Sequence, residues 1–107
     1  MSPINSRAKG KRGEQDFINR ILRPFWPEAR RNVDQFVADK RDVLAVNGVH
    51  FQVKRTETLR IWEALAQASN EAAEHDLPVV AFKRNGGQWY CALEADELVA
   101  LLRLREE

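Results

Sequence analysis

Residues 42–54 contain three side chains whose types and spacing could act on a phosphate. Asp42 opens the stretch, and Gln52 and Lys54 lie two residues apart near its end. Side chains two residues apart in a strand point to the same face of a sheet. Carboxylate and amide oxygens are ligands for Mg²⁺, and an ammonium group stabilises negative charge. The pattern therefore predicts a divalent-metal site beside a lysine, which is chemistry suited to phosphodiester hydrolysis.

The turn at Asn47-Gly48 decides whether Asp42 shares that face. A two-residue loop would pair Asp42 with Val53 and place the carboxylate on the face opposite Gln52. A three-residue loop, with Gly48 at positive φ closing a bulge, would place Asp42 directly opposite Gln52. We favour the three-residue loop because it gathers the apolar side chains of both strands on one face: Val43, Ala45, Val49, Phe51 and Val53.

A further oxygen donor is Glu14, near the start of a helix predicted for residues 13–23. The apolar stripe of this helix consists of Phe17, Ile18, Ile21 and Leu22. Glu14 lies one turn before the stripe, where an acid also interacts favourably with the helix dipole, and that alternative stays open. The candidate metal ligands are then the side chains of Glu14, Asp42 and Gln52 and the main-chain carbonyl of Val53.

Other catalytic chemistries lack the residues they require. Cys91 is the only cysteine, which excludes a disulfide within the chain and a cysteine-based zinc cluster. The serines and the two histidines, His50 and His75, show no spacing typical of a covalent triad. We expect structural or surface roles for both histidines.

The remaining elements alternate between strand and helix patterns. We predict an irregular strand at 30–37, a polar link at 38–41, a helix from Thr58 to about His75, strands at 79–82 and 88–93, and a helix starting at 94. The predicted apolar face of the helix after Thr58 is Ile61, Trp62, Leu65, Ala68, Ser69 and Ala72, and that of the last helix is Leu98, Val99, Leu101 and Leu102. The order αβββαββα predicts an α/β fold.

Composition is that of a single globular domain. The chain has 107 residues, 31% of them charged and 44% hydrophobic. No apolar run approaches the roughly 20 residues that cross a membrane, and the N-terminus lacks the apolar core of a secretory signal. We therefore expect a cytosolic protein without a membrane partner. We divide it into a flexible basic arm at 1–12 and a single domain at 13–107.

Positive charge is concentrated in the first part of the chain. Residues 1–60 hold 13 Lys and Arg against seven Asp and Glu, whereas residues 61–107 hold four against nine. Nucleic-acid phosphates are the partner we predict for the basic residues Lys9, Lys11, Arg12, Arg30, Arg31 and Arg55, with Lys83 and Arg84 as further candidates. No base-reading helix is evident, so recognition of DNA shape is favoured over recognition of sequence. A solvated charged surface is the alternative.

Five segments together resemble a known family. They are Lys-Gly-Lys-Arg-Gly-Glu at 9–14, Arg-Asp-Val at 41–43, Gln-Val-Lys at 52–54, Gln67-Ala68 in an alanine-rich helix, and Val-Val-Ala-Phe-Lys-Arg at 79–84. In order and spacing the chain resembles the PD-(D/E)XK nucleases over roughly residues 9–102. Within that superfamily it is most similar to small phage-encoded and archaeal Holliday-junction resolvase-like endonucleases.

The resemblance implies a fold, an activity and a site. The fold would be a restriction-endonuclease-like αβββαβ core with a central mixed sheet flanked by helices. The activity would be Mg²⁺- or Mn²⁺-dependent, structure-selective hydrolysis of DNA, with branched or junction DNA as substrate. A homodimer in the cytoplasm of a bacterial or phage-infected cell would act on it. The catalytic positions would be Glu14, Asp42, Gln52 and Lys54, with Gln67 in support.

Two features keep alternatives open. Gln52 stands where the family usually has Glu or Asp, and a neutral amide binds a divalent metal less tightly. Gln67 lies opposite the apolar face of its helix, as a solvated glutamine would. The alternatives are a catalytically weak or inactive nuclease-fold module that binds DNA, and a protein-interaction subunit whose acidic C-terminal half docks on a basic partner.

Overall fold

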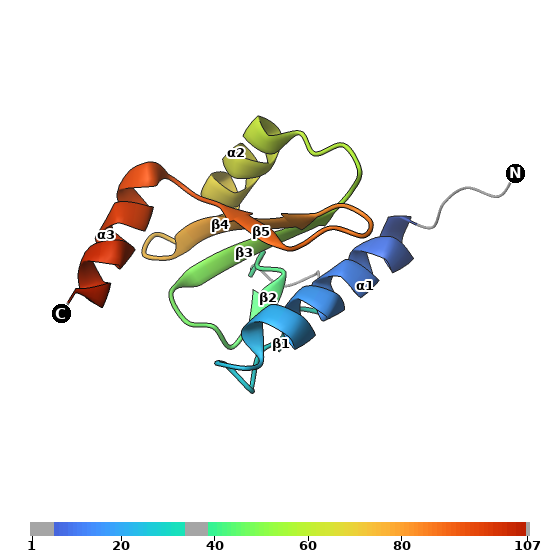
Figure 1. The fold of residues 1–107 in the computed structure, drawn as a ribbon, viewed down its shortest axis with the longest axis horizontal. Helices are drawn as coiled ribbons and strands as arrows, with labels where there is room; N and C mark the ends of the chain where they lie inside the picture. Colours follow the sequence, from blue (N-terminus) through green and yellow to red (C-terminus); the bar gives the residue numbers. More distant parts are fainter. Residues whose placement is uncertain (1–5, 34–38, 107) are drawn as a thin grey trace, which may run out of the picture.

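The fold, seen in a computed structural model, is described for residues 6–33 and 39–106. The elements are α1 (Ser6–Phe17), the π-helical turn η1 (Ile18–Leu22), β1 (Arg30–Arg31), β2 (Val43–Leu44), β3 (Val49–Arg55), α2 (Ile61–Glu71), β4 (Leu77–Lys83), β5 (Tyr90–Ala92) and α3 (Ala95–Arg105). The predicted order of elements and the α/β class, with a mixed sheet flanked by helices, are confirmed (Figure 1). Within the described ranges, no helix is long and apolar enough to cross a membrane.

The main sheet has the strand order β3-β4-β5. β3 runs parallel to β4, and β5 runs antiparallel to β4. Because paired residues share a face, Lys54, Phe82 and Tyr90 form one row across the three strands. β1 and β2 form a separate two-stranded antiparallel sheet.

The main hydrophobic core lies between α1 and the face of the sheet that α1 covers. Phe17 of α1 is buried and contacts Phe51 of β3, with ring centroids 5.2 Å apart, and Trp89, with centroids 5.1 Å apart. A Cβ at Gly13 would lie only 2.9 Å from the Cβ of Arg55. α1 approaches β3 this closely because residue 13 has no side chain, and the approach places the neighbouring Glu14 near the sheet edge.

The opposite face is covered only in part, by α2. Ala64 and Ala68 are buried against Val80, and small side chains at these positions let the helix lie close to the sheet. The prediction that Trp62 and Ser69 belong to the buried face is wrong, because the face at 64 and 68 turns them outward. Trp62 is 82% exposed.

Several predicted boundaries also change. α1 begins at Ser6 instead of the predicted Gly13, so residues 6–12 are helical. Residues 1–5 lie outside the described ranges, and the division into an arm and a domain stays a prediction. α2 begins after an N-cap at Arg60 instead of Thr58 and ends at Glu71. Of the strand predicted at 30–37, only Arg30–Arg31 is a strand, and residues 34–38 lie outside the described ranges.

α3 does not pack as predicted. Its predicted core face, Leu98, Val99, Leu101 and Leu102, is 44–63% exposed, and no described residue of α3 is buried. Figure 1 shows α3 at one end of the molecule, beyond the sheet. The apolar pattern of α3 therefore did not predict whether the helix packs on the sheet.

Candidate active site

Asp42 lies at the edge of β3 that does not pair with β4. Its backbone N–H donates to the Phe51 carbonyl at 3.2 Å, and its Oδ2 accepts from the Val53 N–H at 2.7 Å. The N–H and C=O of one residue point to the same edge of a strand, so the Val53 carbonyl also points to this edge. Hydrogen bonds to Phe51 and Val53, which are successive residues on this edge, therefore fix Asp42 beside β3.

The predicted hairpin ladder between residues 42–46 and β3 is wrong in both registers. β2 pairs with β1 instead, and the chain turns through positive φ at Ala45 (70°) and Gly48 (81°). The predicted placement of Asp42 beside Gln52 is nevertheless confirmed, because Gln52 Nε2 donates to Asp42 Oδ2 at 3.4 Å. The side chain reaches this place from an irregular segment.

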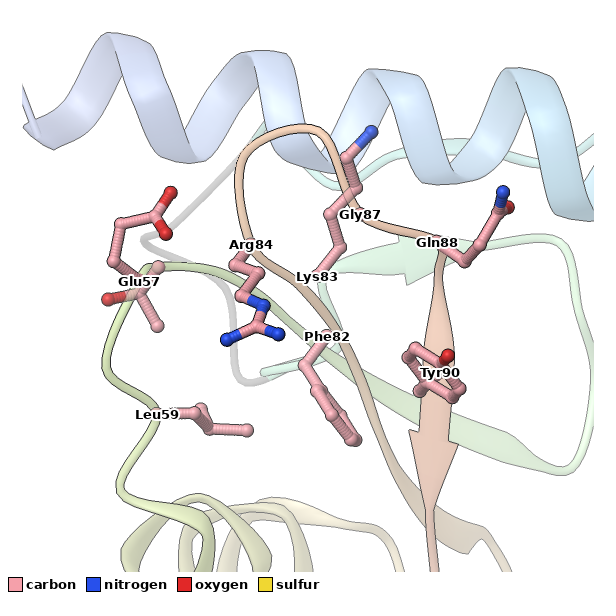
Figure 2. A pocket seen from close by; sticks show the side chains of 9 residues that line it. Glu57, Leu59, Phe82, Lys83, Arg84, Gly87, Gln88 and Tyr90 are labelled. Atoms are coloured by element: carbon pink, nitrogen blue, oxygen red, sulfur yellow. The ribbon is translucent and has the colours of Figure 1, made fainter.

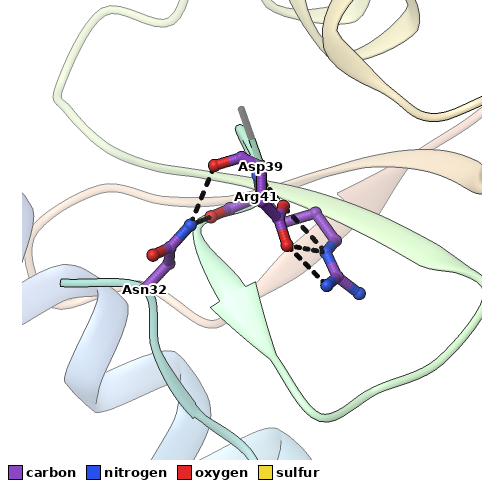
Figure 3. A network of polar contacts seen from close by, with 3 residues as sticks. All are labelled: Asn32, Asp39 and Arg41. Carbon is purple, nitrogen blue, oxygen red and sulfur yellow. Dashed lines mark hydrogen bonds and ion pairs between the residues drawn. The ribbon is translucent and has the colours of Figure 1, made fainter. Parts of the chain in front are cut away.

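A polar brace holds the segment that leads to Asp42 (Figure 3). Asn32 Nδ2 donates to the carbonyls of Asp39 at 3.0 Å and Arg41 at 2.9 Å. The Arg41 guanidinium in turn binds both carboxylate oxygens of Asp39, through Nε at 3.0 and 3.1 Å and through Nη2 at 2.6 Å. The backbone N–H of Asn32 also donates to the Asp42 carbonyl at 3.1 Å. The brace ties this segment to the end of β1.

Glu14 and Asp42 form a close carboxyl pair. Burial and the nearby charge of Asp42 raise the pKa of Glu14 to about 6, although Arg31 opposes the shift by donating from Nε to Glu14 Oε1 at 3.0 Å. Burial also raises the pKa of Asp42, against the hydrogen bond from the Val53 N–H. Two half-buried carboxylates side by side repel each other, and a cation bound between them would relieve that repulsion.

Gln52 is nearly enclosed at the same edge. It is 5% exposed, with Nε2 toward Asp42 and Oε1 at 3.1 Å from His50 Nε2. As a metal ligand, Gln52 would need its amide oxygen on the Asp42 side. A half turn about the last side-chain torsion, which has a broad two-fold profile, exchanges the two amide atoms and lets Nε2 donate to His50.

Lys54 is held by a short chain of hydrogen bonds to α2. Its Nζ donates to Gln67 Oε1 at 3.0 Å, and Gln67 Nε2 donates to Glu71 Oε1 at 3.4 Å. Gln67 is half-buried and so is not the solvated glutamine of the alternative interpretation. Glu14, Asp42, Gln52, Gln67 and Glu71 all line one pocket of about 250 Å³.

The donor set suits a hard cation that keeps water ligands. Among the residues that the structure describes, no three His, Cys, Asp or Glu side chains form a group that could hold a metal. Two carboxylates, one amide and a main-chain carbonyl are all oxygen donors, and Mg²⁺ commonly binds few protein groups beside several waters. Glu14, Asp42, Gln52 and Val53 thus fit such an ion, and the cofactor stays a prediction.

The residues predicted to contact nucleic acid differ in how exposed they are. Lys11 and Arg12 are exposed on α1, which also contains Lys9, and Arg30 is exposed on β1. Arg31 is engaged with Glu14, its side chain only 16% exposed. Arg55 is half-buried against α1 at Gly13. Their contact with DNA stays a prediction, and Arg31 is better placed to hold Glu14 than to bind a distant phosphate.

Sequence reasoning missed three residues of the site. His50 is buried beside Gln52, and strand alternation already put it on that face, but a lone histidine carries no sign of its partner. Glu71 follows Gln67 by one helical turn, which is the spacing that brings two helix side chains together. Asn32 gave no signal, because its brace depends on how β1 and β2 pair.

Comparison with known proteins identifies no family for this chain. The chain matches no protein-family model, no curated protein and no solved structure. The resemblance to the nucleases therefore stays a prediction, and the chemistry of the site is what supports a function.

Proposed function

We propose that this chain is a metal-dependent, structure-selective DNA endonuclease with a restriction-endonuclease-like core, similar to Holliday-junction resolvases. One observation carries the proposal: Glu14, Asp42 and Gln52 line one pocket at the free edge of β3, and Lys54 lies beside it on the same strand face as Gln52. Oxygen donors for a metal next to an ammonium group suit the hydrolysis of a phosphodiester.

Each side chain has a separate task in this proposal. A bound Mg²⁺ or Mn²⁺ would lower the pKa of a water ligand and offset charge on the phosphate. Glu14 and Asp42 supply the negative charge that attracts the ion, and Arg31 holds Glu14 in place. Lys54 stabilises the charge that develops on the phosphate. Gln67 aims the ammonium group by accepting its hydrogen bond.

The proposed substrate is branched or junction DNA, met in the cytoplasm of a bacterial or phage-infected cell. Exposed cations at Lys11, Arg12 and Arg30 would contact phosphates around the site. Phosphate contacts position a protein on DNA without reading sequence, which favours selection by DNA structure.

The proposed homodimer has a candidate interface in α3. This helix is apolar around much of its surface, and such helices are usually buried. Its first turn is acidic, with Asp96 and Glu97, and its last turn is basic, with Arg103 and Arg105. Two copies of α3 packed antiparallel would bury their leucines and set the acidic end of each beside the basic end of the other.

Sedimentation equilibrium tests the interface. Leu101→Glu should convert a dimer to a monomer, whereas Asn70→Glu, a similar charge on an exposed position of α2, should leave the dimer intact. A wild-type chain that is monomeric at all accessible concentrations would contradict the homodimer.

The experiment for the function is a cleavage assay on labelled DNA of several shapes, namely a four-way junction, a flap, a nicked duplex and a plain duplex. The wild-type protein should cut branched DNA with Mg²⁺ and faster with Mn²⁺, and not with EDTA. Asp42→Ala should abolish both cleavage and saturable Mn²⁺ binding. DNA binding without cleavage in either metal would favour the inactive DNA-binding module, and absence of DNA binding would favour the protein-interaction subunit.

A further inference from the structure

A second pocket lies at the C-terminal ends of β3 and β4. It has a volume of about 360 Å³ and lies between the loop at 56–59 and the turn at 84–88 (Figure 2). Its lining includes two aromatic rings, Phe82 and Tyr90, and the guanidinium of Arg84. In Figure 2 the Lys83 side chain extends toward α1, whereas Phe82 points away from it. The pocket therefore opens on the face of the sheet that carries Gln52 and Lys54.

The register of the sheet fixes how far the rings lie from Lys54. Lys54 pairs with Phe82, and Phe82 pairs with Tyr90, so the three side chains stand side by side on neighbouring strands. Neighbouring strands are about 4.8 Å apart, which places the backbone of Tyr90 about 10 Å from that of Lys54. Phe82 thus stands on the strand next to Lys54, and Tyr90 stands one strand further away.

Adjoining pockets connect the aromatic pocket with the pocket of the carboxylate pair. Thr56 and Leu59 line the aromatic pocket and also a pocket that contains Lys54 and Gln67. Gln67 in turn lines the pocket of Glu14 and Asp42. A series of depressions therefore runs from the carboxylate pair, past Lys54, to Tyr90.

The rings are arranged as a platform with an open side. Phe82 and Tyr90 are stacked, with centroids 6.0 Å apart and planes inclined by 27°. Phe82 also packs at the margin of the α2 core, whereas Tyr90 is 62% exposed. Phe82 thus supports Tyr90 from the side of the core, and much of the Tyr90 ring stays accessible to a flat partner.

Of the charged groups that line the pocket, Lys83 turns toward α1 and pairs with Asp16, which leaves Glu57 and Arg84 beside the rings. Glu57 lines it and is held by a hydrogen bond from the Asn85 N–H to Oε1 at 2.8 Å. A fixed carboxylate repels a phosphate but accepts hydrogen bonds from base N–H groups. Arg84 is exposed at the same place and suits the backbone phosphate of a base that enters.

We propose that Tyr90, supported by Phe82, stacks on an unpaired nucleobase of the DNA strand whose phosphate lies at Lys54. A base can stack on a side chain only when its own face is free of the duplex stack. Because stacked nucleotides rise about 3.4 Å each and unstacked ones extend further, a separation of about 10 Å corresponds to a base at most about three nucleotides from the cleaved bond. The inference rests on the proposed nuclease function and specifies its substrate as DNA with an unpaired base near the cut.

The test uses oligonucleotides that carry 2-aminopurine, whose fluorescence falls when it stacks. Metal-free titrations compare a duplex with a short single-stranded gap, the probe lying in the gap, with the intact duplex. Tyr90→Ala should weaken binding to the gapped DNA by about 5- to 150-fold, as expected for loss of one stacked base. Binding to intact duplex should change less than about twofold, and the quench in the gap should disappear.

Three further variants separate stacking from other effects. Tyr90→Phe keeps the ring and should keep the quench, and Tyr90→Leu covers Phe82 without offering a flat face and should lose it. Trp62→Ala removes another exposed aromatic ring, on α2, and should change neither measurement. Equal losses for gapped and intact DNA, or equal effects of Tyr90→Ala and Trp62→Ala, would overturn the stacking site.

The stacking site and the nuclease function can fail separately. Binding is measured without metal, so a selective loss in Tyr90→Ala would support stacking even if no metal supports cleavage. If the wild type cleaves branched DNA but Tyr90→Ala binds gapped DNA as tightly as the wild type does, the stacking site is overturned and the nuclease function is retained. Absence of binding to every DNA would overturn both.

Discussion

The side chains on the two faces of β3 are buried in different ways. On one face, Phe51 and Val53 pack toward Phe17 of α1 in a continuous apolar core. On the other face, His50 and Gln52 are buried as a hydrogen-bonded pair, and Lys54 reaches α2 only through Gln67. The same strand thus anchors the fold through its odd-numbered residues and presents polar groups through its even-numbered ones.

The difference arises from how each helix meets the sheet. α1 and η1 bring large side chains such as Phe17 and Ile18 into the core, whereas α2 contacts the sheet mainly through Ala64 and Ala68. Alanines cover little area, so the row that includes Lys54 and Tyr90 stays partly open. Stability comes mainly from the α1 face, and the α2 face is left available for binding and chemistry.

The largest expected effect is on the α1 face. Phe17→Ala should lower the free energy of unfolding by about 3–5 kcal/mol, because it leaves a cavity between α1 and β3. Tyr90→Ala, on the other face, should cost no more than about 1 kcal/mol, because the ring is 62% exposed. Denaturant unfolding of both variants measures the two values, and similar losses would contradict the division between the faces.

Gln52→Glu tests the polar face directly. Without metal, the new carboxylate would replace an amide that donates to Asp42, and this should cost about 1–3 kcal/mol of stability. With metal, the added charge should lower the Mg²⁺ concentration needed for half-maximal cleavage. Unchanged metal dependence together with unchanged stability would place residue 52 outside the metal site.

The pH dependence of stability tests the carboxyl pair. Glu14 has a pKa of about 6 in the fold against an ordinary value of 4.5, so its contribution to stability is fully present below about 4.5 and is lost as the pH rises through about 6. That difference in pKa corresponds to about 2 kcal/mol. Relative to Glu14→Gln, the metal-free wild type should lose about this much between pH 4.5 and 7. Parallel stability curves for the two proteins would contradict the raised pKa of Glu14, which burial and the charge of Asp42 cause together.

Local patterns in the sequence predicted much of this site. Alternation at 49–55 separated Gln52 and Lys54 from Phe51 and Val53, and residue type predicted the turn at Asn47-Gly48. The convergence of Glu14 with Asp42 was instead implied by the resemblance to the nucleases, because it depends on how α1 meets β3. The alternation and the turn are local features, which a short stretch of sequence contains.

Features that depend on distant partners were not predictable in the same way. The segment before Asn47 has the pattern of a hairpin strand, yet β2 pairs with β1, and β3 pairs with β4. The leucines of α3 show that the helix is apolar but not which surface covers it. The partners of His50 and Asn32 likewise depend on where other segments lie.

The most direct test of the central claim compares Lys54→Ala with Arg60→Ala at saturating branched DNA and Mn²⁺. Both changes remove one cation from the same pocket, but only Lys54 shares the strand face of Gln52 and bonds Gln67. Lys54→Ala should lower the cleavage rate by about 100-fold or more with DNA affinity changed less than about threefold, because a group that stabilises the reacting phosphate is lost. Arg60→Ala should cleave at nearly the wild-type rate. Equal rates for the two variants, or a loss in Lys54→Ala that follows its DNA affinity, would contradict a catalytic site at the edge of β3.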